Sequence, residues 1–179
     1  MKRDDLLDLN DALQHPGRKV AVDLSTELPN EEEIDLVAPV EGFLEAVSTG
    51  NVLLVHGEFK TRCVVECARC AGPLEVDMDF TMDEEFPVEG TPSTFGGDET
   101  AKVVPEFEPN PLFEDNNLLV ENLLRQGVIL NLPIQALCSF GWEGDCPQAK
   151  AVDERRQGAP IGGPFDHLVK LIQPEEPER

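Results

Sequence analysis

Basic residues are scarce in this sequence of 179 residues. Lysine and arginine together number 14, against 36 aspartates and glutamates, and the formal net charge is −22. Such a chain repels a phosphate backbone over most of its surface, whereas proteins that bind nucleic acid carry basic patches. We therefore expect any contact with RNA to be indirect, through a basic protein, or to use a small basic patch. The bland alternative is that the acidity only keeps the protein in solution.

Long apolar runs are also missing. No run approaches the roughly 18 apolar residues of a membrane helix, and the N-terminal MKRDDLLDLNDALQ has no apolar core of signal-peptide length. We therefore expect a cytoplasmic protein that does not contact a membrane. In that compartment, five cysteines are better explained as thiols or metal ligands than as a disulfide framework.

The familiar motifs of catalysis are absent from the sequence. It contains no glycine-rich phosphate loop, no nucleophile elbow, no HExxH motif and no paired catalytic carboxylates. Nothing in it indicates a small-molecule substrate. We predict that the protein is not an enzyme.

The strongest pattern that is present lies between Thr61 and Phe86. Alternate positions of one run are apolar, namely Leu74, Val76, Met78, Phe80 and Met82. The preceding run, from Asn51 to Glu66, keeps the same period, which is typical of strands with one buried face. Between the runs, the motif Cys67-Ala-Arg-Cys70 is followed by Gly72-Pro73, which predicts a tight reversal. The sequence therefore predicts a long antiparallel hairpin with a CxxC motif at its tip, with Gly57 as a candidate bulge.

Weaker patterns flank this hairpin. Leu6, Leu9 and Leu13 are spaced for a short helix, and Lys19 to Leu24 alternates as a strand does. Asp115-Asn116-Asn117 can cap a helix over residues 118–130, which Pro133 prevents from continuing. We predict an α+β fold dominated by an antiparallel β-sheet, with two or three short helices and a mobile acidic insertion.

The length predicts a single domain, residues 1–179. We expect its core at about 16–86 and 115–147, a flexible acidic insertion at 87–114, and a loose C-terminal segment at 148–179. That last segment carries a short amphipathic helix pattern at Phe165, Leu168, Val169 and Ile172. Residues 71–124 contain fourteen acids and one base, so over half of the negative surplus lies there. Such runs are usually solvated spacers and less often docking surfaces for basic partners.

Four cysteines are candidate ligands of one metal ion. Cys67 and Cys70 have the spacing of a zinc knuckle, and Cys138 and Cys146 form a second pair in a loop that contains two glycines. Four thiolates from two loops would make a structural zinc site, although the second pair lies outside the common knuckle spacing. Cys63 is different, because it falls on the apolar phase of its strand and is expected to be a buried free cysteine.

Two alternatives to a metal site remain open. The thiols can simply be reduced in a site that binds no metal, or the CxxC motif can be redox-active, with Arg69 lowering a thiolate pKa. Against the redox alternative, such motifs usually lie where a strand meets the start of a helix, and here both flanks have strand patterns.

The candidate contacts with a partner are the few concentrated cations and the only tryptophan. Lys60 and Arg62 share one face of the long strand, and Arg69 follows at the tip. For this strip we favour pairing with acids of the neighbouring strand, worth at most about 1 kcal/mol per contact; those acids are Glu75, Asp77 and Asp79. Trp142 either closes a small core over the cysteine loop or anchors a partner.

The order of these features resembles the bacterial YceD family, the large ribosomal RNA subunit accumulation proteins, which also occur in plastids. The residues that carry the resemblance are the C-x-R-C knuckle at 67–70, Asp83-Glu-Glu-Phe86, the leucine-rich helix, Leu130-Asn-Leu-Pro-Ile-Gln-Ala-Leu-Cys138 and Gly144-Asp-Cys146-Pro147. The resemblance covers roughly Pro16 to Ile172. The family usually has four cysteines in its second cluster, where this chain has Cys138 and Cys146 with Trp142 and Ala149 in the other two places. Ala71 replaces the usual leucine after the knuckle.

The resemblance implies a non-enzymatic factor that supports accumulation of large-subunit ribosomal RNA and assembly of the large subunit. The gene for such proteins is commonly a neighbour of one for a small large-subunit ribosomal protein. The expected partner is therefore a large-subunit ribosomal protein or the assembling subunit itself. A zinc site made by Cys67, Cys70, Cys138 and Cys146 is compatible with the departures noted above. Two rival functions are a direct rRNA-binding zinc module and a CxxC thiol oxidoreductase.

Overall fold

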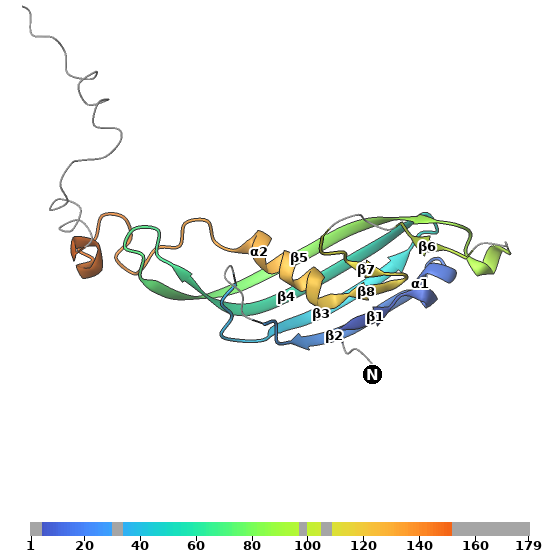
Figure 1. Ribbon diagram of the computed structural model, residues 1–179, viewed down its shortest axis with the longest axis horizontal. Coiled ribbons are helices and arrows are strands. Elements are labelled where there is room, and N and C mark those ends of the chain that lie inside the picture. Colours follow the sequence, from blue (N-terminus) through green and yellow to red (C-terminus); the bar gives the residue numbers. More distant parts are fainter. Residues whose placement is uncertain (1–4, 30–33, 97–99, 105–108, 152–179) are drawn as a thin grey trace, which may run out of the picture.

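The computed structural model describes residues 5–29, 34–96, 100–104 and 109–151, so the helix pattern at Phe165 lies outside the described residues. Five antiparallel strands form the main sheet in the order β2-β3-β4-β5-β6 (Figure 1). Their bounds are β2 Lys19–Thr26, β3 Val40–Ser48, β4 Val52–Glu66, β5 Pro73–Glu89 and β6 Lys102–Val103. A smaller antiparallel sheet has the order β1-β8-β7, with β1 Leu6–Asp8, β8 Asn117–Leu119 and β7 Phe113–Glu114. The labelled helices are α1 Asn10–Gln14, the 3-10 turn η1 Ser93–Phe95 and α2 Val120–Asn131, and residues 147–151 are also helical. The predicted α+β class with a dominant antiparallel sheet is confirmed.

The predicted hairpin is the centre of the main sheet. β4 and β5 pair without interruption from Val52↔Pro87 to Glu66↔Pro73, and the rings of Phe59 and Phe80 face each other at 5.5 Å on the buried side. β5 continues beyond the predicted end to Glu89. The bulge suggested at Gly57 is wrong, because the register is continuous there. This glycine instead leaves room for Phe59, whose ring would lie 2.5 Å from an added Cβ.

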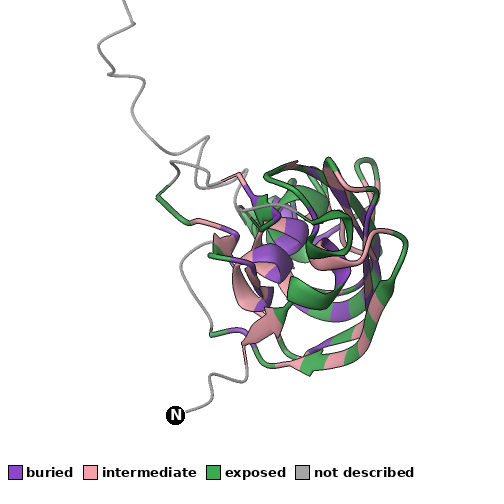
Figure 2. Ribbon diagram, turned by 90° about the vertical axis from the view of Figure 1, so that its right-hand side faces the viewer, coloured by how far each residue is buried: buried purple, intermediate pink, exposed green. Residues whose placement is uncertain are grey.

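Helix α2 lies against one face of this sheet, and the sheet curls around it (Figure 2). Its buried residues include Leu123, Leu124 and Val128. At Gly127 the helix approaches β5 so closely that an added Cβ would lie 2.5 Å from the Met82 sulfur and 2.7 Å from the Phe80 ring. The burial of this helical face therefore depends on a glycine at the point of closest contact.

The predicted start of this helix is wrong. Residues 117–119 form β8 instead, and α2 begins after Leu119 with no side-chain cap. Asn116 is buried, and its side chain bonds Asn10, the carbonyl of Ala101 and the backbone N–H of Val103. It therefore joins three separate chain segments rather than capping a helix. The predicted end is confirmed, because α2 stops at Asn131, ahead of Pro133.

The N-terminal leucines are divided between two elements. Leu6 lies in β1, which pairs with β8. Leu9, directly before α1, and Leu13, within α1, are fully buried. The predicted helix therefore begins later than expected.

Part of the predicted insertion at 87–114 belongs to the packed structure. Ala101, Val103 and Leu112 are buried in the main core, and β6 extends the sheet. The mobility of this stretch and the division of the chain into core, insertion and tail stay predictions.

Among the described residues, no helix has the length and apolar character needed to span a membrane.

Candidate metal centre

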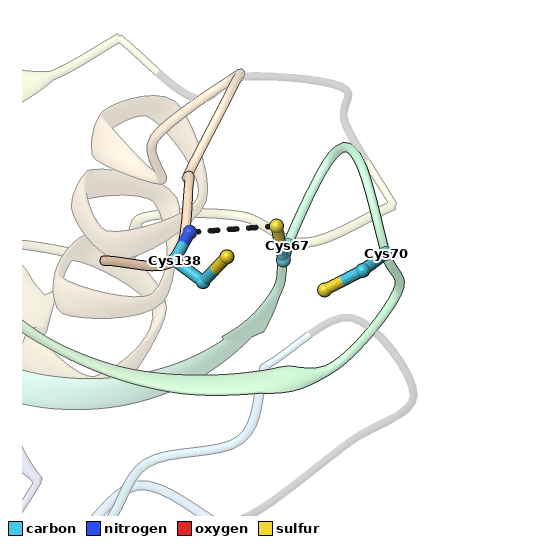
Figure 3. Close-up of side chains that lie close together, drawn as sticks. All are labelled: Cys67, Cys70 and Cys138. Atoms are coloured by element: carbon cyan, nitrogen blue, oxygen red, sulfur yellow. Dashed lines mark hydrogen bonds between the residues drawn. The ribbon is translucent and has the colours of Figure 1, made fainter. Parts of the chain in front are cut away.

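The tip of the β4–β5 hairpin holds the CxxC motif in a tight turn. The backbone N–H of Cys67 donates to the carbonyl of Gly72 at 2.8 Å, and the N–H of Ala71 donates to the carbonyl of Cys67 at 2.8 Å. Ala71 completes the turn with a φ of 54°. This turn brings the side chains of Cys67 and Cys70 to the same side of the tip (Figure 3).

The segment after α2 docks on this tip. The N–H of Ala68 donates to the carbonyl of Ala136 at 2.8 Å, and the N–H of Cys138 donates to the sulfur of Cys67 at 3.4 Å (Figure 3). The sulfurs of Cys67, Cys70 and Cys138 lie within 4.8 Å of one another. A tetrahedral zinc ion with Zn–S bonds of about 2.3 Å separates its sulfurs by about 3.8 Å, so small side-chain adjustments suffice to bind one.

Cys146 reaches the same cluster from the C-terminal side. Residues 147–151 are helical and begin at Pro147, a residue that suits the first position of a helix. Cys146 is buried with Cys67, Cys70 and Ala149, and its thiol interacts with those of Cys70 and Cys138. The structure thus packs Cys146 beside the other three predicted cysteines, although the sulfurs that all lie within 4.8 Å of one another are those of Cys67, Cys70 and Cys138.

Backbone N–H groups surround two of these thiols and favour their ionised forms. The N–H groups of Cys138, Cys70 and Arg69 lower the pKa of Cys67 to about 6. The N–H of Ala149 and then that of Gln148 outweigh the effect of burial and lower the pKa of Cys146. Backbone donors of this kind prepare sulfurs for a cation, because a thiolate is the form that binds metal.

Cys70 shows the opposite behaviour. The N–H of Gly72 favours its thiolate, but desolvation and the neighbouring thiols of Cys67 and Cys146 outweigh that bond and raise the pKa of Cys70 to about 11. Several thiolates so close together repel one another unless a cation lies between them. The donor set therefore fits a divalent, thiophilic ion such as zinc.

Arg69 has a role that the sequence did not reveal. Its guanidinium donates to the carbonyls of Gly141 at 3.0 Å and Gly144 at 2.7 Å, across the loop between the second pair of cysteines. It therefore fixes the loop that carries Cys138 and Cys146. No local sequence pattern predicts this contact, because both acceptors are backbone carbonyls more than 70 positions away.

The other residues predicted to contact a partner lie in different surroundings. The guanidinium of Arg62 lies 2.6 Å from Asp77, the neighbouring-strand pairing that we favoured, whereas the ammonium of Lys60 lies 3.6 Å from Glu41 on β3. Trp142 is 54% exposed, so it does not close a core over the cysteine loop. Contact of these residues and Arg69 with a partner stays a prediction.

Cys63 is separate from the cluster. It is fully buried on β4 and free, as predicted, and desolvation raises the pKa of its thiol. Cys67 is only 2% exposed and lies between two strands rather than at the start of a helix. This placement restricts the access of another molecule's thiol or disulfide to it, which disfavours redox catalysis.

Comparisons with known proteins find one family. The model of YceD, described as large ribosomal RNA subunit accumulation protein YceD, matches residues 55–171, more than half of the chain. The chain is 27% identical over 170 residues to uncharacterized protein Rv2926c of Mycobacterium tuberculosis and to uncharacterized protein Mb2951c of Mycobacterium bovis. Each match covers 90% of this chain and 72% of the relative. No solved structure matches the chain.

Proposed function

Because the chain belongs to the YceD family of large ribosomal RNA subunit accumulation proteins, we propose that it is a non-enzymatic factor that supports assembly of the large ribosomal subunit. The observation that carries this proposal is the family match over residues 55–171, which includes the complete cysteine cluster. The family supplies the process, and the charge and geometry of this chain suggest how the protein takes part.

The test of this role is depletion of the protein in the organism that encodes it. We expect large-subunit rRNA to fall relative to small-subunit rRNA, and re-expression of the intact chain to restore the ratio. An unchanged ratio during growth without the protein would contradict the proposal.

The mode of action that we propose is binding of a basic large-subunit ribosomal protein, which is held in solution until it meets the rRNA. The net charge of −22 supports this mode, because opposite charge speeds association and selects basic partners. Exposed acids line the outward face of β5, including Glu75, Asp77 and Asp79. Binding of purified basic ribosomal proteins should weaken markedly from low to high salt, and salt-insensitive binding would contradict this mode.

The cysteine cluster serves in this proposal as a structural zinc site with Cys67, Cys70, Cys138 and Cys146 as ligands. Bound zinc supplies a cross-link between the hairpin tip and the segment after α2. The proximity of the sulfurs and the N–H bonds to Cys67 support it. We expect one zinc per chain by elemental analysis, less in Cys138→Ser, and an unchanged content in the matched Cys63→Ser variant. Zinc-free protein that was purified without chelator would contradict the site.

Two other functions make different predictions. A direct rRNA-binding zinc module would bind rRNA without protein partners, with a salt dependence set by Lys60, Arg62 and Arg69. A thiol oxidoreductase would have a CxxC thiol that is alkylated rapidly at neutral pH in the folded protein. The first is opposed by the overall charge and the second by the burial of Cys67.

A further inference from the structure

Exposed large apolar side chains are concentrated in the stretch of chain that leads from the end of α2 into the cysteine loop. Seven such side chains occur among the described residues, and five of them lie between residues 129 and 142. They are Ile129, Leu130, Ile134, Phe140 and Trp142, and we call residues 129–142 the apolar segment. Ile134 is 97% exposed and Leu130 77% exposed. Exposed apolar residues grouped in this way usually mark a surface that another molecule covers.

The backbone of the apolar segment is held in place from Ala136 onward. Ala136 accepts a bond from Ala68 of the hairpin tip, and Cys138 donates to the sulfur of Cys67. Farther along, the guanidinium of Arg69 binds the carbonyl of Gly141, and the N–H of Gly144 donates to the carbonyl of Phe140 at 2.9 Å. A surface fixed before binding loses less conformational entropy when a partner docks, so these ties favour recognition.

The surroundings of the apolar segment select the charge of the partner. Glu66 at the end of β4 and Glu143 beside Trp142 are exposed acids. The neighbouring cations are Arg69, whose guanidinium binds neutral loop carbonyls, and Lys150, whose ammonium lies 2.9 Å from Asp145. These residues comprise three acids against two bases, in a chain whose net charge is −22, and this excess of acids suits a partner that presents apolar groups among lysines and arginines.

We propose that the apolar segment is the docking site for a basic ribosomal protein. Ile134, Phe140 and Trp142 contact its apolar side chains, and the flanking glutamates face its cations. Aromatic residues in such positions commonly contribute most of the binding energy. The inference rests on the proposed function and assigns its partner to one end of the molecule, the end that carries the cysteine cluster (Figure 1).

Site-specific photo-crosslinking tests this assignment. A photoreactive residue replaces Ile134 in the full chain, and a matched control carries it at Phe95, which is 71% exposed in η1 at the other end of the sheet (Figure 1). The probe is the RNA-free protein mixture extracted from large subunits of the same organism. We expect position 134 to form adducts with one or a few basic ribosomal proteins and position 95 to form none.

The possible outcomes separate this inference from the proposed function. Adducts of position 134 with residues 152–179 of the same chain would overturn the docking site, as would adducts with rRNA alone when intact precursor subunits are supplied. Salt-sensitive binding of the mixture without adducts at position 134 would overturn the site and leave the proposed mode intact. If the intact protein binds nothing in the mixture, the proposed mode fails together with the site.

Substitution gives a second measurement. Ile134→Ser should weaken binding of the crosslinked ribosomal protein roughly tenfold, as expected for a central apolar contact. Val37→Ser, at another exposed apolar position, should leave the affinity unchanged. Equal losses in both variants would overturn the site, because they would show a general effect of surface hydrophobicity.

Discussion

Arg69 joins the two halves of the cysteine cluster through the backbone of the loop rather than through another side chain. It is half-buried and donates to the carbonyls of Gly141 and Gly144, the second of which also accepts the N–H of Cys146. A hydrogen bond from a charged donor contributes about 1.5–3 kcal/mol, so its loss should loosen the loop strongly.

Replacement of Arg69 tests this contribution. In Arg69→Met, amides of residues 138–146 should exchange hydrogen at least about tenfold faster than in the parent protein, because a bond of this class opposes loop opening. Arg62→Met is the matched control, since Arg62 is exposed and makes an ion pair on the sheet surface. Unchanged exchange of the loop in Arg69→Met would show that Arg69 does not hold it.

The thiol of Cys67 gives a prediction about pH. In reduced, metal-free protein its pKa of about 6, against the usual 9.0, makes the thiolate the dominant form at neutral pH. The corresponding stabilisation is complete above pH 9 and is lost as the pH falls towards about 6. The pKa of Cys70 is raised to about 11, so its contribution to the stability of the folded protein is lost as the pH rises from 9 towards 11.

Ultraviolet thiolate absorbance measures this titration. We expect a step near pH 6 in the metal-free protein that disappears in Cys67→Ser and persists in Cys63→Ser, since burial raises the pKa of Cys63. A titration without any step below pH 8 would contradict the role of the backbone N–H groups around Cys67.

At the scale of the elements, α2 depends on the close approach of its backbone to β5. Leucine at position 127 would gain at most about 1 kcal/mol of helix propensity over glycine. Its side chain, however, would occupy the space of the Met82 sulfur and the Phe80 ring. Overpacking of this kind costs about 1–3 kcal/mol, so the steric cost decides the sign.

We therefore expect Gly127→Leu to lower the free energy of unfolding by about 1–2 kcal/mol, measured by urea denaturation. Gln126→Leu adds the same side chain to a half-exposed position of the same helix and should change stability by at most about 0.5 kcal/mol. If Gly127→Leu were more stable than the parent, the close packing of α2 on β5 would be refuted.

At the scale of the molecule, the described residues contain two separate apolar clusters. One lies between the main sheet, α2 and the small sheet, and the other is the small cluster around the cysteines. Only the second contains the proposed metal ligands. Metal removal should therefore loosen one end of the molecule and leave the main sheet folded.

Chelation of purified, zinc-loaded protein tests this division. Amides at residues 67–72 and 136–146 should lose protection from hydrogen exchange, whereas those of β4 between Leu53 and Phe59 should keep it. Loss of protection throughout the sheet would show that the metal holds the whole fold. Unchanged hydrogen exchange at residues 67–72 and 136–146 would show that the metal stabilises neither the tip nor the sheet.

Several features could be predicted from the sequence because they depend on local patterns. Strict alternation of apolar and acidic residues determined the hairpin of β4 and β5, and Pro133 set the limit of α2. The CxxC spacing identified the knuckle at the hairpin tip, since two thiols so close in sequence share one turn. The family resemblance, confirmed over residues 55–171, came from the order of these same local features.

Only the tertiary structure decided the remainder, because the contacts involved join positions far apart in the chain. The strands β1, β7 and β8 have two or three residues each, too few for any period to appear. Asn116 binds Asn10 across 106 positions, and Arg69 reaches carbonyls of a loop that follows α2 in the chain. The sequence alone determined which cysteines were available, whereas the docking of the segment after α2 on the hairpin tip brought the sulfur of Cys138 within 4.8 Å of those of Cys67 and Cys70.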